Sequence, residues 1–243
     1  AILPFEPAFY NGLDIDVKYV GHPLIDEIHT PLGRDEFLEE LGVDKEKRIV
    51  GLFPGSRRSE IDYMFDTLLE TGQKIMQSEP DTHFLVPLAS TLKREELQSR
   101  LDRSDLPATL VQAEVYDTIN ACDAIVSVSG TVTLQIAMIG TPMAIFYKMA
   151  PLTYAIGRRL VKVDYVGLAN IVAGRQVACE YIQEEATPEN LAHEILRILH
   201  DDNYHEQLSA GLAEVKSRMG EPGCSERVAR MLSELIDTKE ANH

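Results

Sequence analysis

The sequence predicts an α/β fold: a doubly wound parallel sheet with extra helices at its C-terminal end. Short apolar runs rich in β-branched residues alternate with segments whose apolar residues recur at helical spacing. The strand candidates are apolar throughout and do not alternate, which is typical of parallel strands covered by helices on both faces. Right-handed crossovers between such strands produce the doubly wound arrangement.

The first ten residues, AILPFEPAFY, are predicted to form a strand, and we expect further residues to precede Ala1. The run RIVGLF at 48–53 is a buried strand that ends at Pro-Gly-Ser, and helical spacing follows it through about residue 77. Strands and helices then alternate. The further strands are predicted at 83–89, 108–113, 124–129 and 142–148, and the further helices at 92–101, 115–122, 131–139 and 151–161.

After residue 187 the chain is predicted to be helical, over 187–201, 202–220 and 225–237. Thr187 before Pro188 is a strong helix-start signal, because threonine caps the first turn and proline suits its first position.

The charge balance excludes some classes of partner. The chain has 39 acidic and 23 basic residues and a net charge of −16, which argues against a nucleic-acid-binding surface. Its three cysteines are widely spaced and form no CxxC motif, which indicates a reducing, cytoplasmic compartment. No apolar run approaches the roughly 20 residues that a transmembrane helix needs.

The loop GLFPGSRRSEI, between the strand at 48–53 and its helix, has the chemistry of an anion site. Gly55 permits a tight turn, Ser56 supplies a hydroxyl and an amide, and Arg57 offers a planar fork suited to phosphate oxygens. The alternative is a Pro-Gly turn with a serine cap and a solvent-facing arginine. The loop is not a GxxxxGK[ST] phosphate loop, because it lacks the lysine.

A second such loop follows the strand at 124–129. Ser129 or Thr131 can cap the next helix, Gly130 allows close approach of a ligand, and the Thr133 hydroxyl lies in the first turn. The alternative is an ordinary strand-to-helix turn. Two amide-presenting helix starts on one sheet edge suit an elongated anion such as a nucleotide diphosphate.

Gln135 lies one turn further along the same helix face as Thr131. From there its side chain could reach a sugar hydroxyl next to the phosphates. The alternative is a partly exposed helix position without a ligand.

Six motifs occur in an order that closely resembles the C-terminal half of the bacterial lipid-A-disaccharide synthase family. They are LPFEPAFY, YVGHPL, LFPGSRRSEI, SVSGTVTLQIAMIGTPM, YKMAPLTYAIGRRLVKVDYVGLANIVAGR and EYIQEEATPENLA. The resemblance implies a metal-independent, inverting glycosyltransferase of the GT-B type, which has two Rossmann-like domains. Such an enzyme joins a UDP-diacylglucosamine donor to a diacylglucosamine 1-phosphate acceptor in a β(1→6) linkage and releases UDP.

The resemblance also implies roles for residues. Gly55, Ser56 and Arg57 hold the donor diphosphate, and Arg57 stabilises the charge on the departing UDP. The remaining implied donor-site residues are Ser129, Gly130 and Thr131 for the phosphates, Phe146, Tyr147 and Lys148 around the uracil, and His22, Asn170 and Gln183 facing the interdomain cleft. At Gln135 the family usually has a ribose-binding glutamate, so donor binding is expected to be about 1 kcal/mol weaker.

The resemblance divides the chain into three parts. Residues 1–20 end a missing N-terminal domain and linker, 21–187 form the donor-binding domain, and 188–243 are C-terminal helices that cross to the N-terminal domain or pack on their own. The implied N-terminal domain holds the general base and the acceptor site, and contacts the cytoplasmic face of the inner membrane. The chain alone is expected to bind UDP weakly and to be inactive. A UDP-sugar epimerase and a non-catalytic nucleotide-sugar-binding protein remain as alternatives.

Overall fold

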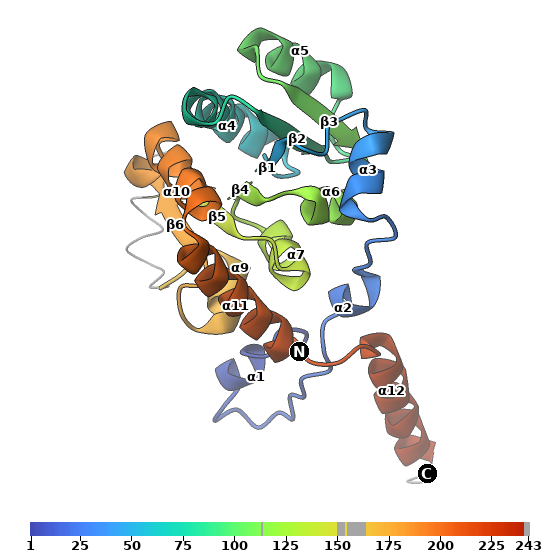
Figure 1. Cartoon of the computed structure of the whole chain (residues 1–243). Helices are drawn as coiled ribbons and strands as arrows, with labels where there is room; N and C mark the ends of the chain where they lie inside the picture. The colour runs from blue at the N-terminus through green and yellow to red at the C-terminus, as the bar shows by residue number, and fades with distance from the viewer. Residues whose placement is uncertain (113, 150–153, 155–163, 241–243) are drawn as a thin grey trace.

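In the part of the chain that the computed structural model describes, residues 1–112, 114–149, 154 and 164–240, six strands form a parallel sheet (Figure 1). Its strand order is β3-β2-β1-β4-β5-β6. The strands are β1 (Arg48–Phe53), β2 (Thr82–Leu88), β3 (Ala108–Gln112), β4 (Ala124–Val128), β5 (Met143–Tyr147) and β6 (Cys179–Ile182). The helix expected at 151–161 lies outside the described residues except at Tyr154.

Most of the described helices connect the strands or cover one of the two faces of the sheet. They are α1 (Glu6–Phe9), α2 (Leu24–Glu27), α3 (Arg34–Glu40), α4 (Arg58–Ser78), α5 (Arg94–Ser104), α6 (Val115–Ala121), α7 (Thr131–Ile139), α9 (Leu168–Ala173), the 3-10 turn η1 (Gln183–Glu185), α10 (Pro188–His200), α11 (Asp202–Arg218) and α12 (Cys224–Glu240). None of the described helices is both long enough and apolar enough to span a bilayer.

The sheet is doubly wound, as predicted. From β1 the chain runs outward through β2 to β3 and then returns to the other side of β1 to place β4. Side chains of α4, α5 and α10 form one core against the sheet. The helices α3, α6, α7 and α9 lie on the opposite face (Figure 1), where their side chains form the second core. The helix α11 contributes side chains to both cores. The change of direction between β1 and β4 is the switch point at which such folds bind ligands.

The strand predicted for the first ten residues is wrong. These residues contain the short helix α1 instead, with Pro7 in its first turn. Pro4 and Pro7 have no amide hydrogen to give to a ladder. The Glu6 carboxylate accepts hydrogen bonds from the amides of Ile2 and Leu3 at 2.8 and 2.9 Å, and these bonds fold the segment back on itself.

Several short elements of the described chain were not predicted: α2, α3, α9, β6 and η1. The helix α9 has six residues and ends at Gly174, whose φ is +64°. The edge strand β6 pairs only with β5 and has four residues, one of them the charged Glu180. Such short segments carry too few apolar residues to show a period.

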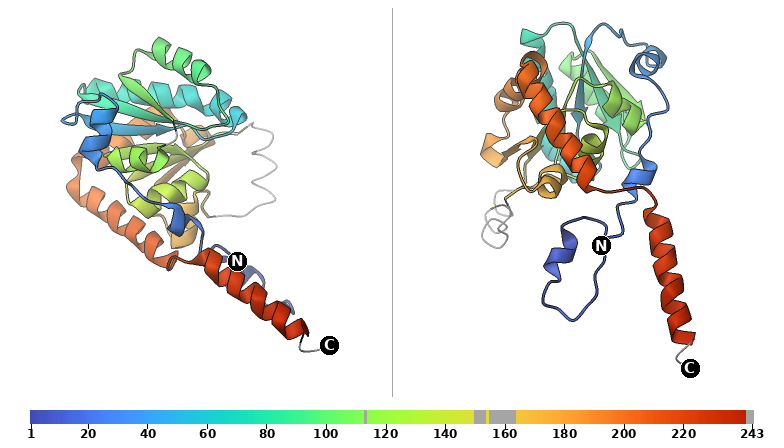
Figure 2. Two further views of the ribbon diagram at one scale, coloured as in Figure 1. Left: turned by 90° about the vertical axis from the view of Figure 1, so that its right-hand side faces the viewer. Right: turned by 60° about the horizontal axis from the view of Figure 1, so that its bottom comes forward.

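The predicted C-terminal helices are confirmed, but they differ in packing. The helix α10 lies in the core beside α4, and α11 packs against α7 and α9. The helix α12 extends away from this body (Figure 2), with Leu232, Leu235 and Ile236 more than half exposed.

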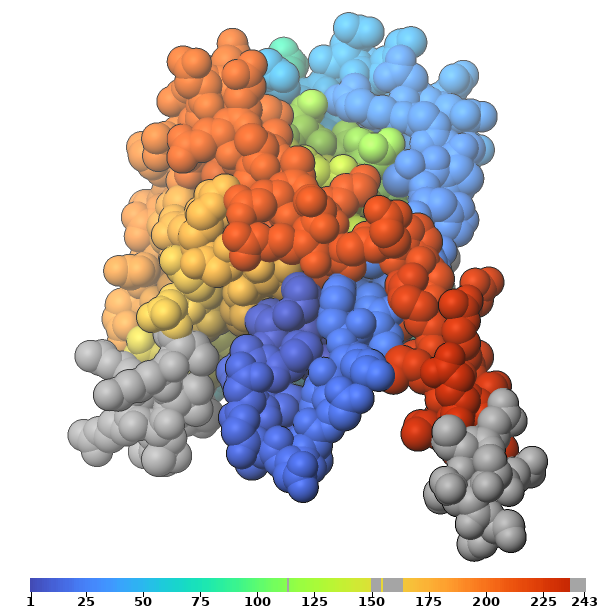
Figure 3. Space-filling model, turned by 90° about the horizontal axis from the view of Figure 1, so that it is seen from below, coloured from blue at the N-terminus to red at the C-terminus, as the bar shows by residue number. Residues whose placement is uncertain are grey.

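The N-terminal segment, residues 1–28, contacts the turn between α11 and α12. The view from below shows this segment next to the two helices (Figure 3). The Asp26 carboxylate accepts from the amides of Gly223 and Cys224 at 2.7 and 3.2 Å. Arg227 donates from Nε to the Val20 carbonyl at 2.8 Å. Hydrogen bonds therefore join the N-terminal segment around residues 20–26 to the start of α12.

Candidate functional site

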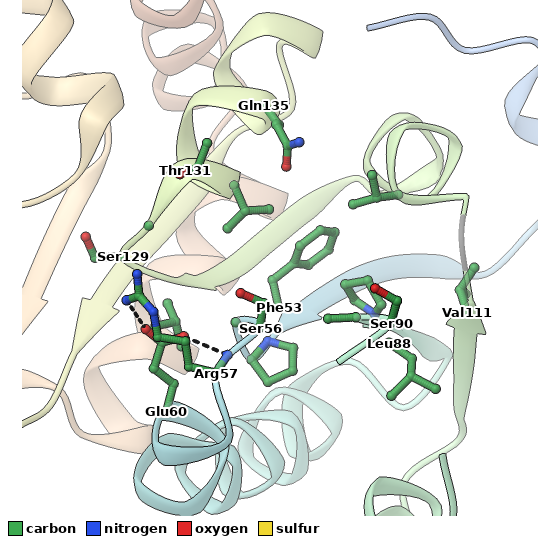
Figure 4. Close-up of a pocket in the computed structure, with 18 of the residues that line it drawn as sticks. Phe53, Ser56, Arg57, Glu60, Leu88, Ser90, Val111, Ser129, Thr131 and Gln135 are labelled. Carbon is green, nitrogen blue, oxygen red and sulfur yellow. Dashed lines mark hydrogen bonds and ion pairs between the residues drawn. The ribbon is translucent and has the colours of Figure 1, made fainter. Parts of the chain in front are cut away.

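A cavity of about 500 Å³ lies at the carboxyl ends of β1 to β4, at the switch point of the sheet (Figure 4). Both predicted anion loops, β1–α4 and β4–α7, line it. The lining residues of these two loops are Pro54, Gly55, Ser56, Arg57, Glu60, Ser129, Gly130, Thr131, Val132 and Gln135. The structure thus brings the two helix starts together, as the sequence predicted.

The β1–α4 loop is built around Gly55 and Glu60. Gly55 has a φ of +88°, and a Cβ added there would lie 2.5 Å from Glu60 Oε2. Glu60 is 8% exposed. Its Oε2 accepts from the Arg57 amide at 3.3 Å, and its Oε1 accepts from Arg57 Nη1 at 2.9 Å (Figure 4). Arg57 therefore lies at the cavity, with most of its guanidinium donors still available.

Glu60 was missed by the sequence reasoning, although a signal was present. The residue before α4 is Arg57, so the serine cap of the alternative interpretation is not formed by Ser56. A glutamate at the third helical position that accepts from the amide before the helix is half of a capping box. The spacing from Arg57 to Glu60 carried this information.

The β4–α7 junction presents backbone amides to the cavity. Gly130 precedes α7 in an extended conformation, φ 173°, and a Cβ there would meet nothing within 4 Å. Among the described residues no side chain caps α7, and the amides of Thr131 and Val132 have no acceptor. Unpaired amides and the positive end of the helix dipole attract an anion.

Two threonine and serine predictions at this junction are wrong. Thr133 is completely buried and donates its hydroxyl proton to the Gly130 carbonyl at 2.8 Å, so it does not reach the cavity. Ser129 lines the cavity but does not cap α7, because its hydroxyl donates to the Val166 carbonyl at 2.8 Å.

Gln135 lines the cavity one turn beyond the start of α7, and its side chain points into it (Figure 4). Its neighbour is Tyr116. Burial raises the pKa of the Tyr116 hydroxyl, and a hydrogen bond with Gln135 partly opposes that rise. We call the part of the cavity lined by Arg57 and the start of α7 its anion end. Gln135 is thus a polar group between the anion end and the remaining part of the cavity.

The other end of the cavity is apolar. It is formed by the ends of β2 and β3 and the start of α6, with Pro87, Leu88, Val111 and Val115 in its wall. Leu88 and Val111 lie on the side away from Arg57 and Ser129 (Figure 4). We call this end the apolar wing.

The uracil prediction at 146–148 is not supported by the geometry. Phe146 is completely buried in the core. The Lys148 amine donates to Thr67 Oγ1 of α4 at 3.0 Å. Tyr147 packs against the same core as α4 and α10. These three residues do not line the cavity.

His22, Asn170 and Gln183 also lie away from the cavity. His22 Nδ1 accepts from the Leu24 amide at 3.1 Å, and burial lowers the pKa of its imidazole. Asn170 is completely buried in a hydrogen-bond network of its own. Gln183 accepts from the Met149 amide at 2.8 Å and donates to the Met149 carbonyl at 3.1 Å. In this structure the side chains of all three residues form hydrogen bonds with backbone groups.

The cavity offers no ligand set for a metal. Within the described chain, no group of three or more His, Cys, Asp or Glu side chains is arranged to hold a metal ion. The positive groups facing the cavity are Arg57 and the helix amides.

Comparison with known proteins agrees with the sequence and the fold. A family model described as lipid-A-disaccharide synthetase matches residues 1–230. A lipid-A-disaccharide synthase of Syntrophotalea carbinolica is 55% identical over 235 residues, covering 97% of this chain and 60% of the relative. One from Geobacter sulfurreducens is 48% identical, with 97% and 61% covered. The chain thus spans about three fifths of the length of these relatives.

Two solved structures share the fold at low identity. They are Anabaena Alr3699/HepE in complex with UDP-glucose and the S. aureus MnaA–UDP co-structure. The first has a TM-score of 0.57 at 16% identity, with 90% of this chain and 57% of that chain covered. The second has a TM-score of 0.58 at 13% identity, with 96% and 58% covered. Fold, motif order and family match together show that the chain belongs to the lipid-A-disaccharide synthetase family.

Proposed function

We propose that this chain is the donor-binding part of a lipid-A-disaccharide synthase, which joins UDP-2,3-diacylglucosamine to 2,3-diacylglucosamine 1-phosphate. The observation that carries the proposal is the convergence of two helix starts and Arg57 on one cavity. The names of the relatives, at 55% and 48% identity, supply the reaction.

In the proposed complex the donor pyrophosphate lies between the β1–α4 and β4–α7 junctions. The free amides of Thr131 and Val132 donate to its oxygens, and the guanidinium of Arg57 binds it from the other side. Glu60 holds Arg57 through Nη1 at 2.9 Å, so the remaining donors of the fork face the ligand.

The transfer inverts the anomeric carbon. The acceptor 6-hydroxyl gives its proton to a base and attacks C1 of the donor sugar, while the bond from C1 to the phosphate oxygen breaks and UDP takes the electron pair. Negative charge grows on the β-phosphate in this step, where Arg57 and the amides stabilise it. This arrangement replaces a metal ion, so no cofactor is invoked.

The nucleoside follows the length of the cavity. Gln135, next to the anion end, accepts from ribose hydroxyls through its amide oxygen. The apolar wing, with Leu88 and Val111, is suited to a flat uracil ring. This placement replaces the expectation that Phe146, Tyr147 and Lys148 frame the base.

The remaining parts of the reaction are assigned to the segment of the relatives that this chain does not span. We place there the general base, the acceptor site and the contact with the cytoplasmic face of the inner membrane. The relatives' names favour a transferase over a UDP-sugar epimerase. The product assay below separates it from a non-catalytic binding protein.

Calorimetric titration of the chain with UDP tests the donor site. Arg57→Ala should weaken binding roughly tenfold or more, because a hydrogen bond to a charged group contributes about 1.5–3 kcal/mol. Arg58→Ala is the matched control, since Arg58 pairs with Glu96 and does not line the cavity. Equal affinities of the two variants, or no binding by the wild type, would contradict the proposed site.

A product assay tests the reaction. The full-length enzyme should form the disaccharide 1-phosphate and UDP, and this chain alone should form neither. Disaccharide formed by these 243 residues without a second polypeptide would refute the division of labour.

A further inference from the structure

The carboxylate of Glu180 organises a segment beside the anion end of the cavity. Glu180 lies on the edge strand β6. Its Oε2 accepts from the Val166 amide at 2.8 Å, and its Oε1 accepts from the Gly167 amide at 2.9 Å. Asn170 Nδ2 donates to the same Oε1 at 2.6 Å. Hydrogen bonds to an ionised acceptor are the strong ones, so three of them fix the Val166–Gly167 backbone against the sheet.

The same backbone contacts the cavity wall. The Ser129 hydroxyl donates to the Val166 carbonyl at 2.8 Å, and Ser129 lines the cavity. Val166 thus uses its amide on Glu180 and its carbonyl on Ser129. Two hydrogen bonds connect the Glu180 carboxylate to the β4–α7 junction.

This connection changes the role of Ser129. A hydroxyl has one proton, and Ser129 uses it on Val166, so it has none for a phosphate. The phosphate donors at this junction are the amides of Thr131 and Val132. The direction in which these two amides point depends on the position of the β4–α7 junction.

The position of Glu180 is fixed by Asn170, which is itself hydrogen-bonded to backbone groups. The Asn170 Oδ1 accepts from the amides of Val177 and Ala178 at 2.7 and 3.0 Å, and its Nδ2 also donates to the Ala178 carbonyl at 2.8 Å. A Cβ at Gly167 would lie 2.6 Å from Ile145 Cδ1 and 3.1 Å from Glu180 Oε1, so the backbone is packed against β5 and β6.

We propose that Glu180 is a positioning residue for the pyrophosphate, which acts through Val166 and Ser129 to hold the β4–α7 junction in its binding position. The proposal rests on the proposed UDP site. Supporting residues of this kind set the precision of a site that they do not touch. The network makes no contact with Gln135 or the apolar wing, so its effect is confined to the phosphate end of the ligand.

The test compares two ligands, UDP and uridine, in calorimetric and competition titrations of the chain. Glu180→Gln keeps the shape of the side chain but replaces one carboxylate oxygen by an NH2 group. That group faces N–H donors and cannot accept their hydrogen bonds. It should weaken UDP about fivefold or more and leave uridine unchanged. Glu184→Gln, on an exposed neighbour four positions along, should bind both ligands as the wild type does. Equal loss for UDP and uridine, or no loss, would overturn the proposal.

A double-mutant cycle tests the route. Because both residues act through Val166, Ser129→Ala with Glu180→Gln should weaken UDP no more than the worse single variant. If the affinity losses of the two single variants multiply in the double variant, the two residues act independently and the proposed connection through Val166 is ruled out. If Glu180→Gln does not fold, Ser129→Ala alone decides, since it removes the bond to Val166 and should reduce affinity for UDP only. Failure of the wild type to bind UDP overturns the proposed function and this inference together, whereas unchanged variants overturn only the inference.

Discussion

Two glycines border the cavity for different physical reasons. Gly55 has a φ of +88° and leaves room for the Glu60 carboxylate, so the backbone itself requires glycine. Gly130 is extended and has open space where a side chain would be, so the fold itself does not require glycine there. The fold therefore explains the first glycine, and the proposed ligand would explain the second.

Gly55→Ala should destabilise the chain by about 1–3 kcal/mol and weaken UDP binding, because strain at positive φ is combined with displacement of Glu60. Chemical denaturation measures the first effect and calorimetry the second. Gly12→Ala is the control, since Gly12 has a φ of +91° but nothing within 4 Å of an added Cβ. A Gly55→Ala variant no less stable than Gly12→Ala would contradict this explanation.

Gln135→Glu should bind UDP roughly fivefold more tightly at pH 7, because a charged acceptor strengthens the hydrogen bonds from ribose by about 1 kcal/mol. Titration with the 2′,3′-dideoxy analogue of UDP is the control, since it lacks both hydroxyls and should show no gain. A gain that persists with the analogue would place the ribose elsewhere.

The sequence predicted the place of a site residue correctly where that residue follows the end of a parallel strand. Gly55, Arg57, Gly130 and Gln135 follow strand ends, and their position in the fold brings them to the cavity. Thr133 was wrongly predicted because a hydroxyl in a first turn can donate to the carbonyl three residues back. No local pattern distinguishes the two outcomes.

At the scale of elements, β6 and the helices α10 and α11 meet around one buried carboxylate. Glu194 of α10 is 3% exposed and accepts from the hydroxyls of Tyr181 and Tyr204. Burial raises the pKa of both tyrosines, and the charge of Glu194 adds to the rise. Three elements that follow one another along the chain are thus joined where two tyrosine hydroxyls donate to the carboxylate of Glu194.

This junction should make the fold sensitive to alkali. Since their pKa values are raised in the folded state, both tyrosines keep protons that the unfolded chain releases near pH 10. The unfolded state then binds fewer protons, so the free energy of unfolding falls as pH rises above about 10. Denaturation between pH 8 and 11 measures this. Tyr181→Phe should reduce the dependence, whereas Tyr63→Phe, on an exposed side chain, should not.

Prediction of elements succeeded where the apolar period was long. The helix α4 shows it over 21 residues, and β1 and β4 are continuous apolar runs. It failed for the first ten residues, where apolar composition masked two prolines, and for β6, whose four residues gain their structure from pairing with β5.

At the scale of the molecule, the cavity depends on both cores. Its walls come from β1 and α4 on one side of the switch point and from β4 and α7 on the other, and these helices cover opposite faces of the sheet. The sequence predicts the doubly wound order, but only the register of β1 beside β4 brings the two loops to one opening. A ligand bound there links the two halves of the sheet.

UDP should therefore stabilise the whole domain. At a hundred times its Kd a ligand that binds only the folded state adds about 2.7 kcal/mol, which for a chain of this size raises Tm by roughly 5–10 °C. Gly130→Leu separates this effect from folding. Its extended backbone accepts any residue and its side chain fills the cavity, so the variant should keep the Tm of the unliganded wild type and lose the shift with UDP. A shift that survives in Gly130→Leu would mean that UDP binds elsewhere on the molecule.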